Sequence, residues 1–244
     1  MTEEGLPQHL AIIMDGNGRW AQLRRKPRAY GHIRGTRVAK KMITECSRLG
    51  IKVLTLYAFS TENWLRPQSE VNLLMKLLQR YLARETENLI KENIRFTVIG
   101  NLEKLPADTI SAISSAMQAT EKCHGLNLVF ALSYGSRQEI TEMVKTIAEK
   151  VQTKQLTVAD INEQVVLEHL STFPIPDPDL IIRTSGEKRL SNFLLWQAAY
   201  SEFYFAETLW PDFTQKDLYQ ALKNFSLRQR RFGKLQISDE KLHN

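Results

Sequence analysis

The first candidate functional residues in the chain lie in a glycine-rich turn that follows a short apolar run. The run covers residues 10–14, and the next five residues are Asp15, Gly16, Asn17, Gly18 and Arg19. Glycines let backbone N–H groups approach an anion closely, a guanidinium binds phosphate oxygens, and a carboxylate can hold a divalent cation that bridges the same anion. The stretch therefore predicts a phosphate-binding turn, with a purely structural turn as the alternative. It matches neither the P-loop nor the G-x-G-x-x-G pattern of nucleotide-binding proteins.

A second cluster of phosphate-binding side chains follows another apolar run, at residues 180–182. The cluster consists of Arg183, Gly186, Arg189 and Ser191. Residues 60–66 and 133–137 also follow apolar runs and offer Ser, Asn and Arg side chains. Because guanidinium groups bind phosphate oxygens in a bidentate manner, the cluster predicts a second phosphate site, with an ordinary charged loop as the alternative.

A basic segment, residues 24–28, lies close to the first turn and taken alone fits a solvated loop. Arg28 and His32 are four positions apart, so one face of a helix would present both side chains to a diphosphate held by the turn. A lone histidine is more often structural than catalytic, and that is the alternative for His32.

Six apolar runs with the character of strands alternate with helical patterns. The runs cover residues 10–14, 53–59, 94–99, 126–132, 180–182 and 203–205. Strands that alternate with helices favour right-handed crossovers and a parallel sheet, whose ligands bind at the carboxyl ends of the strands. No repeat or break in composition divides the chain, so we expect a single α/β domain over residues 1–244, with a core at about 9–233 and flexible tails at 1–8 and 234–244.

The spacing of apolar residues also predicts the helices. They cover residues 35–49, 67–93, 106–123, 136–151, 160–170 and 214–231. Gly50 and Gly125 are expected to end the first and third helices, and Ser69 is expected to cap the long one. Residues 71–82 are apolar on more than one face, which indicates either burial between the sheet and a neighbour or a face that lines an apolar ligand tunnel.

The composition is that of an ordinary globular protein, with 43% apolar and 25% charged residues. The net charge of +6 fits an anionic partner, which includes nucleic acid, a membrane surface or a phosphorylated metabolite. Cys46 and Cys123 both fall in predicted helices, so neither a disulfide framework nor a zinc site is expected. No apolar run is long enough to span a membrane and no signal segment is visible, so we expect a cytoplasmic protein with at most peripheral membrane contact.

Four segments together resemble the cis-prenyltransferase family, and most closely the bacterial undecaprenyl diphosphate synthases. They are HLAIIMDGNGRW at 9–20, LTLYAFSTENW at 54–64, DLIIRTSGEKRLSNF at 179–193 and the motif Arg231-Phe-Gly233. The aspartate-rich motif of the trans-type enzymes is absent, and Ser185 stands where a glycine is common. The resemblance implies a twisted, mainly parallel sheet of about six strands ringed by helices, in a homodimer.

The resemblance also implies a reaction. Isopentenyl diphosphate would add repeatedly to an allylic diphosphate such as farnesyl diphosphate, with Mg²⁺, to give a Z-polyprenyl diphosphate. Undecaprenyl diphosphate is the expected product, and decaprenyl or short-chain products are the alternatives. By the same resemblance Asp15 would organise Mg²⁺ and Glu202 would assist it.

The remaining roles are implied in the same way. The allylic diphosphate would be held by the backbone of residues 16–18 and by Arg19, Arg28 and His32. Arg183, Arg189 and Ser191 would bind isopentenyl diphosphate, and Arg231 and Gly233 would reach the partner's site. Asn63, Ser60 and His32 are the expected catalytic residues besides Asp15, with Ser60 in a proton relay. Trp20, Thr61, Glu62, Trp64 and Arg66 complete the expected substrate-binding set. Separately, the apolar character of residues 71–82 suggests that the long helix lines a product tunnel and sets product length, with Ala58, Leu74, Leu78 and Leu126 along it.

Two other classes of function remain as alternatives. A non-catalytic subunit would keep the fold and need a partner, but such subunits usually lose the motif residues that this chain keeps at Asp15 and Arg183. A nucleic-acid-binding domain would interleave exposed aromatic residues with Lys and Arg, whereas the four tryptophans lie mostly beside apolar runs. We therefore expect no nucleic-acid partner.

Overall fold

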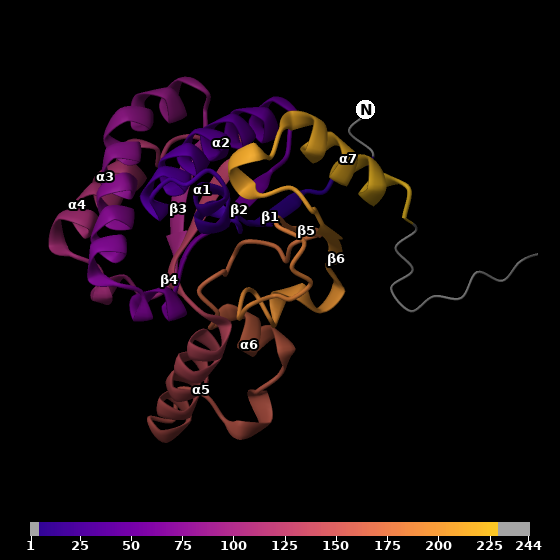
Figure 1. The fold of residues 1–244 in the computed structure, drawn as a ribbon. Coiled ribbons are helices and arrows are strands. Elements are labelled where there is room, and N and C mark those ends of the chain that lie inside the picture. The colour runs from indigo at the N-terminus through magenta and orange to yellow at the C-terminus, as the bar shows by residue number, and fades with distance from the viewer. Residues whose placement is uncertain (1–4, 229–244) are drawn as a thin grey trace, which may run out of the picture.

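A six-stranded, all-parallel sheet forms the centre of the protein (Figure 1). The computed structural model describes residues 5–228, so Arg231, Gly233 and the expected tail at 234–244 lie outside the described residues. The strands are β1 (His9–Ile13), β2 (Val53–Ser60), β3 (Arg95–Ile99), β4 (Asn127–Tyr134), β5 (Leu180–Arg183) and β6 (Glu202–Phe205), in the order β3-β4-β2-β1-β5-β6. The parallel α/β class and all six expected strands are confirmed.

Helices connect the strands and cover the sheet. They are α1 (Asn17–Leu23), α2 (Arg28–Arg48), α3 (Gln68–Lys91), α4 (Ala107–Ala119), α5 (Ser136–Gln152), α6 (Glu163–Glu168) and α7 (Gln215–Ser226). Short 3-10 helices lie at η2 (Thr61–Leu65), η3 (Leu102–Lys104), η4 (Val158–Asp160), η5 (Gln197–Tyr200) and η6 (Trp210–Asp212). Buried side chains of α2, α3, α4 and α7 pack together with the sheet, whereas α5 and α6 project from the other side with a small cluster of their own (Figure 1).

The central strand β1 shows why the sheet is buried on both faces. Leu10 and Ile12 pack into the large cluster under the helices, and Ala11 and Ile13 pack into a second cluster on the opposite face. When the side chains on both faces of a strand are apolar, both faces of the sheet must be covered, as is usual for parallel sheets.

The order of the strands creates a switch point at β1. The chain first builds the sheet on the β2 side of β1 and later adds β5 on the other side. Ile13 is level with Tyr57 of β2 and with Arg183 of β5, so the loops that leave these three strands emerge side by side. Ligands of open α/β sheets bind at such a point.

Three of the long helices begin directly after a proline. Pro27, Pro67 and Pro106 occupy the positions before α2, α3 and α4. Proline is tolerated at this N-cap position because the residue precedes the helix and its missing N–H removes no helical hydrogen bond. The prediction that Ser69 caps the long helix is therefore wrong, and α2 begins at Arg28, earlier than expected, inside the basic segment.

Other helix ends also differ from expectation. The third predicted helix ends at Ala119, so Gly125 does not terminate it and Cys123 lies in the following turn. The predicted helix at 160–170 is divided between η4 and the short α6. Gly50, with φ +78°, does follow the end of α2 as predicted. No helix within residues 5–228 combines the length and apolarity needed to cross a bilayer.

Candidate active site

A cavity of about 840 Å³ opens at the carboxyl ends of β1, β2 and β5. This volume is near the upper end of the roughly 300–1,000 Å³ typical of ligand pockets. The rim is polar, and the lining inside is apolar. The apolar lining comprises Ala39, Ala58, Phe59, Leu74, Met75, Leu77, Leu78, Tyr81, Phe130 and Leu132. Phe130 is level with Leu56 and Ile12 in the sheet, so the cavity extends between the sheet and α3 towards the middle of the strands.

The glycine-rich turn forms one side of the rim. Gly16 has φ +104°, a conformation that L side chains rarely adopt, and a Cβ there would lie 2.8 Å from Leu209 Cδ2. The Gly16 N–H donates a hydrogen bond to Asp15 Oδ1 at 2.6 Å, and Thr184 Oγ1 donates to the backbone oxygen of Asp15 at 2.7 Å. The turn after β1 is thereby fixed to the residue that follows β5.

Two arginines surround the Asp15 carboxylate. Arg183 Nη2 donates to Asp15 Oδ2 at 2.9 Å, and Arg19 Nη2 lies 3.4 Å from the same oxygen. Burial on its own would raise the pKa of Asp15, but the hydrogen bond and charge of Arg183, with Arg19 and the Gly16 N–H, bring that pKa below its usual value. Asp15 is therefore a carboxylate at neutral pH. Arg183 is buried and also donates to Ser191 Oγ at 2.7 Å and to the backbone oxygen of Arg189.

A carboxylate, Glu187, joins two of the predicted phosphate-binding arginines. Arg19 Nη1 donates to Glu187 Oε1 at 2.9 Å, and Arg189 Nη1 donates to Glu187 Oε2. Arg19 Nη2 also donates to Ser185 Oγ at 2.5 Å. Ser185 has φ +79°, a conformation that glycine adopts without strain and other residues adopt rarely.

A second group of cations meets at the first turns of α2 and α3. Glu70 accepts hydrogen bonds from Arg28 Nε at 3.1 Å and from Arg66 Nη1 at 2.9 Å, and its Oε1 lies 3.3 Å from His32 Nε2. The helix α2 does present Arg28 and His32 on one face. Burial of the His32 ring and the charge of Arg66 lower the pKa of His32, so the ring is neutral at pH 7.

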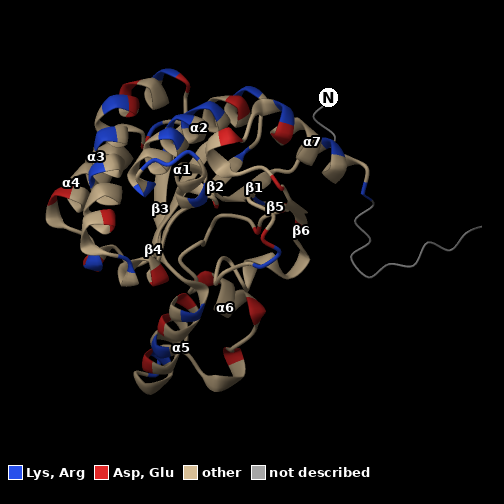
Figure 2. Cartoon of the chain, in the orientation of Figure 1, with Lys and Arg blue, Asp and Glu red and all other residues tan. Residues whose placement is uncertain are grey.

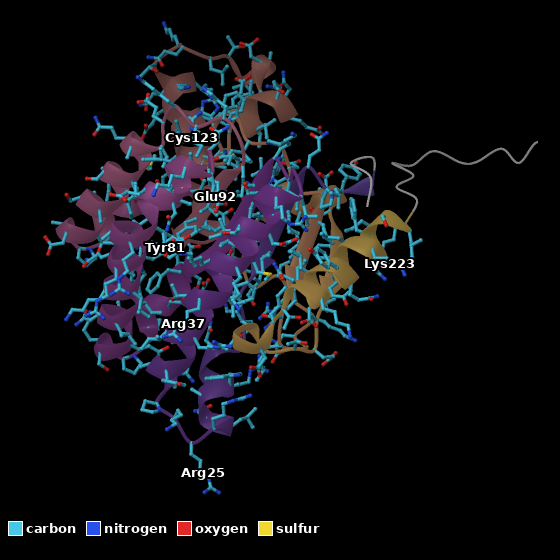
Figure 3. All side chains as sticks on the ribbon, turned by 90° about the horizontal axis from the view of Figure 1, so that it is seen from above. Arg25, Arg37, Tyr81, Glu92, Cys123 and Lys223 are labelled. Atoms are coloured by element: carbon cyan, nitrogen blue, oxygen red, sulfur yellow. The ribbon has the colours of Figure 1, made fainter. Side chains whose placement is uncertain are left out.

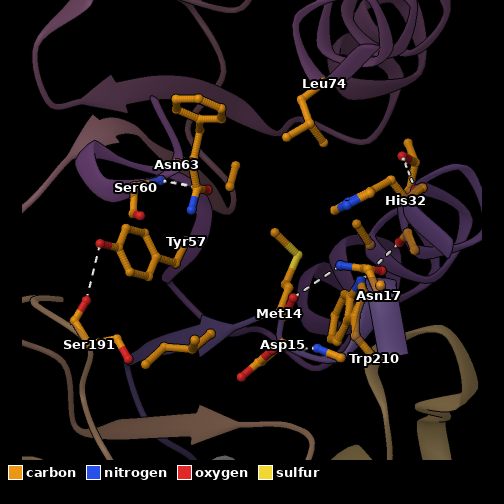
Figure 4. Close-up of a pocket in the computed structure, with 18 of the residues that line it drawn as sticks. Met14, Asp15, Asn17, His32, Tyr57, Ser60, Asn63, Leu74, Ser191 and Trp210 are labelled. Atoms are coloured by element: carbon orange, nitrogen blue, oxygen red, sulfur yellow. Dashed lines mark hydrogen bonds between the residues drawn. The ribbon is translucent and has the colours of Figure 1, made fainter. Parts of the chain in front are cut away.

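The loop after β2 supplies the opposite side of the rim (Figure 4). The Ser60 N–H donates to Asn63 Oδ1 at 3.2 Å, and both side chains line the cavity. Tyr57 also lines it and donates to the backbone oxygen of Ser191 at 3.3 Å, which connects this side to the second cluster. Burial raises the pKa of Tyr57, so its hydroxyl keeps its proton and acts as a donor.

The structure brings most of the expected site residues together around this one cavity. Those that line it are Asp15, Gly16, Asn17, Gly18, Arg19, Arg28, His32, Ala58, Ser60, Glu62, Asn63, Arg66, Leu74, Leu78, Arg183, Arg189 and Ser191. Their roles in substrate binding and catalysis stay predictions. Tyr57, Glu187 and Asn192 also line the cavity and were not singled out from the sequence. All three lie inside the quoted motifs, which is the signal that could have identified them. Glu70 was not singled out either; it lies outside the cavity lining and pairs with Arg28 and Arg66.

Five expected site residues lie elsewhere among the described residues. Trp20 is buried and stacks on Tyr30 at 5.9 Å between ring centroids. The Trp64 ring packs against Phe59, and its Nε1 donates to Ser133 Oγ. The buried Thr61 hydroxyl has no hydrogen-bond partner within residues 5–228 and is outside the cavity lining. Trp20 and Trp64 therefore have packing roles in this chain.

Leu126 and Glu202 lie at the amino ends of strands. Leu126 directly precedes β4, and Glu202 begins β6 at the level of Leu180 and Leu10. Asp15 lies five residues beyond Leu10, which corresponds to roughly 16 Å along a strand. Glu202 and Asp15 of the same chain are therefore far apart. Glu202 instead forms an ion pair with Arg228 at 2.5 Å.

The residues at the rim fit a magnesium ion that arrives with a phosphate ligand. No group of three or more His, Cys, Asp or Glu side chains that could hold a metal is present in residues 5–228. Mg²⁺ does not need such a group, because it commonly takes one or two carboxylates and completes its shell with phosphate oxygens and water. The ionised Asp15 supplies one such carboxylate.

The fold and the cavity define a class of protein. It is an α/β protein with a cationic rim that opens into a long apolar interior, which suits ligands with an anionic head and an apolar tail. A family model described as putative undecaprenyl diphosphate synthase matches residues 13–233. The chain belongs to this family of cis-prenyltransferases, and it is an enzyme of the prenyltransferase class.

Individual relatives agree with this assignment. An isoprenyl transferase of Staphylococcus saprophyticus is 52% identical over 94% of this chain and 91% of its own length. The crystal structure of lavandulyl diphosphate synthase from Lavandula x intermedia, in complex with dimethylallyl diphosphate, has a TM-score of 0.92 and 40% identity over 95% of this chain and all of that one. A probable undecaprenyl diphosphate synthase from Campylobacter jejuni has a TM-score of 0.77 and 36% identity, with coverage of 93% and 99%.

Proposed function

We propose that the chain adds isopentenyl diphosphate repeatedly to an allylic diphosphate, with farnesyl diphosphate as the primer. The proposed product is a Z-polyprenyl diphosphate, undecaprenyl diphosphate, the precursor of the lipid carrier for cell-wall polysaccharides. The observation that carries this proposal is the arrangement of two cationic groups, Arg19 with Arg28 and Arg183 with Arg189, at the mouth of one apolar cavity of about 840 Å³. A diphosphate fits each cationic group, and the growing chain fits the cavity.

The two cationic groups would take different substrates. The turn at residues 16–18, with Arg19, Arg28 and His32, would hold the allylic diphosphate. Arg183, which already donates to Ser191, would hold isopentenyl diphosphate together with Arg189. Supporting evidence for an allylic ligand is the dimethylallyl diphosphate bound to the lavender relative.

In the proposed reaction the bond between C1 of the allylic chain and its diphosphate oxygen breaks, and the electron pair leaves with the diphosphate. The double bond of isopentenyl diphosphate supplies the electrons for the new bond to C1. A proton is then lost from the adduct to leave a Z double bond, with Ser60 in the relay that removes it and Asn63 beside it. The product is again an allylic diphosphate, one isoprene unit longer, so the cycle can repeat.

The rim would stabilise the negative charge that develops on the departing diphosphate. Converging guanidinium groups and N–H donors act most strongly where charge develops and water is excluded. Mg²⁺, held through Asp15, would neutralise part of the same charge. The apolar lining next to the rim, including Ala58 and Phe59, would keep water away from the allylic cation.

A short-chain product is the second candidate, because a relative at 40% identity is a lavandulyl diphosphate synthase. The apolar lining reaches Tyr81 and Phe130, deep under α3, which favours the long product. We propose further that the enzyme is a homodimer in the cytoplasm with peripheral membrane contact. The edge strand β6 pairs only with β5 within residues 5–228, which leaves its other edge available to a second copy.

The test is incorporation of labelled isopentenyl diphosphate into butanol-extractable product, with farnesyl diphosphate as primer. Product should form with Mg²⁺, disappear with EDTA and disappear in Asp15→Ala. Asp212→Ala is the matched control, because Asp212 pairs with Arg24 outside the cavity and its loss should leave activity unchanged. Chromatography of the product then distinguishes undecaprenyl from short chains. Well-folded protein that makes no product from several primers would favour the non-catalytic subunit instead.

A further inference from the structure

The positive charge of the chain is concentrated in one segment. Residues 16–44 contain nine Lys and Arg and no Asp or Glu, whereas the net charge of the whole chain is only +6. The segment forms α1, the turn after it and most of α2. Figure 2 colours the Lys and Arg positions along these two helices blue. The remainder of the chain is therefore slightly acidic, and this corner of the molecule is the basic pole.

Several of these cations have no acidic partner. Within residues 5–228, no carboxylate pairs with Arg25, Lys26, Arg34 or Arg37. All four side chains are exposed. In Figure 3 Arg25 projects from the far tip of the molecule, and Arg37 lies further along α2. None of these four cations forms an ion pair at the rim of the cavity, so the geometry of the rim gives no reason for their presence.

Exposed apolar side chains lie among the same cations. Leu23 at the end of α1 is 75% exposed, and Tyr30 and Ile33 of α2 are 50% and 38% exposed. Tyr30, Ile33, Arg34 and Arg37 follow the i, i+3, i+4, i+7 spacing of one helix face. We call the set Leu23, Arg25, Lys26, Tyr30, Ile33, Arg34 and Arg37 the basic tip.

The basic tip and the cavity share one helix. Arg28, His32, Gly35, Thr36 and Ala39 line the cavity. With roughly 100° per residue, these positions centre on the side of α2 opposite to Tyr30, Ile33, Arg34 and Arg37. The helix α2 therefore has one face towards the substrate and the other towards solvent, and its first turns form part of the mouth.

We propose that the basic tip binds the surface of an anionic lipid bilayer and places the mouth of the cavity next to it. The proposal rests on the proposed function, because a long apolar product needs a route from the cavity into lipid. Cations near an anionic leaflet are attracted to it, and exposed aliphatic side chains insert at the boundary of headgroups and acyl chains. A surface that binds single-stranded nucleic acid usually has aromatic side chains on which the bases stack. Here Leu23 and Ile33 are aliphatic, and Tyr30 already stacks on Trp20.

The experiment measures binding of the full chain to phosphatidylcholine vesicles with and without phosphatidylglycerol, by co-sedimentation in the absence of substrate. The triple variant Arg25→Gln, Lys26→Gln, Arg34→Gln should bind the anionic vesicles about a hundredfold more weakly, since each such cation contributes roughly a factor of five. The matched control Lys104→Gln, Lys122→Gln, Lys154→Gln removes three exposed cations elsewhere and should bind as the parent does.

A second variant distinguishes binding to a lipid bilayer from binding to any polyanion. Leu23→Ser with Ile33→Ser keeps every charge and should weaken vesicle binding about tenfold, because two inserted side chains are lost. Binding of a random oligonucleotide should not change in that variant. Equal loss in the triple variant and its control would overturn the proposal, as would tighter binding to the oligonucleotide than to anionic vesicles. Prenyl transfer, assayed separately in detergent, should stay at the parent level in all these variants, so failure of the docking proposal is distinct from failure of the proposed function.

Discussion

Asp15 and Arg183 lie at the ends of neighbouring strands, and their side chains join them across the rim of the cavity at 2.9 Å. Arg183 is only 4% exposed, so Asp15 is the charge partner of a buried guanidinium as well as a candidate metal ligand. The pair connects two segments that are 168 residues apart in the chain.

Asp15→Asn should therefore affect both chemistry and stability. We expect activity to fall by about a hundredfold or more, because the lost charge acts where the diphosphate departs. The free energy of unfolding should also fall by roughly 1–3 kcal/mol, because a buried arginine loses its ionised partner. Steady-state kinetics and urea denaturation measure the two effects, with Asp212→Asn as control. Full activity in Asp15→Asn would contradict the role given to Asp15.

The buried His9 should make stability depend on pH. Its Nε2 lies 2.7 Å from Thr55 Oγ1 and its Nδ1 lies 2.6 Å from the Pro176 oxygen, and burial lowers the pKa of His9 to about 4. In the unfolded chain the ring titrates near its ordinary pKa of about 6.5. Between these values the unfolded chain binds more protons, so stability is full above pH 6.5 and is lost as pH falls towards 4.

The size of this effect can be measured by urea denaturation at pH 7 and pH 4.5. The parent should lose on the order of 2–3 kcal/mol through His9 over that interval. His9→Gln should be less stable at pH 7, but its stability should fall less on acidification. A parallel fall in the two proteins would show that other groups cause the acid sensitivity.

The lining of the cavity should set the length of the product. Ala58→Leu places extra bulk in the wall, so the product should be shorter. Tyr81 lies between this cavity and a smaller one of about 180 Å³ that Lys40 and Glu85 also line. Tyr81→Ala should join the two spaces and lengthen the product, whereas Tyr81→Phe keeps the ring and should change nothing. Chromatography of dephosphorylated products decides the matter, and identical length distributions in all three variants would refute this role.

The close contact between α1 and α2 should not tolerate a side chain at Gly31. A Cβ there would lie 1.9 Å from the backbone oxygen of Asn17, which belongs to the phosphate-binding turn. Gly31→Ala should cost at least about 2 kcal/mol of stability, because a backbone must move to admit it. It should also raise the KM for the allylic substrate. Arg34→Ala, on the exposed side of the same helix, is the control and should leave both quantities unchanged.

The strands could be predicted because their sequences leave little choice. A run such as residues 10–14 is too short for a buried helix and has no polar face, so it fits only a strand covered on both sides. The start of α2 was missed because the charged residues around Arg28, judged from the sequence alone, are typical of a solvated loop. What makes them helical is packing against α1 through Gly31, which appears only in three dimensions.

The candidate site divides in the same way. Residue types at strand ends predicted the two cationic groups, since all carboxyl ends of a parallel sheet meet at one edge. The carboxylates Glu70 and Glu187 were missed, because a glutamate among arginines in sequence does not reveal which arginines it will join. Leu126 and Glu202 illustrate the converse: both were expected at the site, but Leu126 directly precedes β4 and Glu202 begins β6, so both lie at the other end of the sheet.

The position of β1 in the sheet also determines at which stage of chain synthesis the active site can form. Its neighbours are β2 and β5, and β5 is synthesised after most of the chain. During translation one edge of this apolar strand stays unpaired until residues 180–183 arrive, and pairing over such a sequence separation is generally slow and exposes an edge that is prone to aggregation. Because Asp15 meets Arg183 at the contact between β1 and β5, the rim of the cavity cannot form until residue 183 has been synthesised.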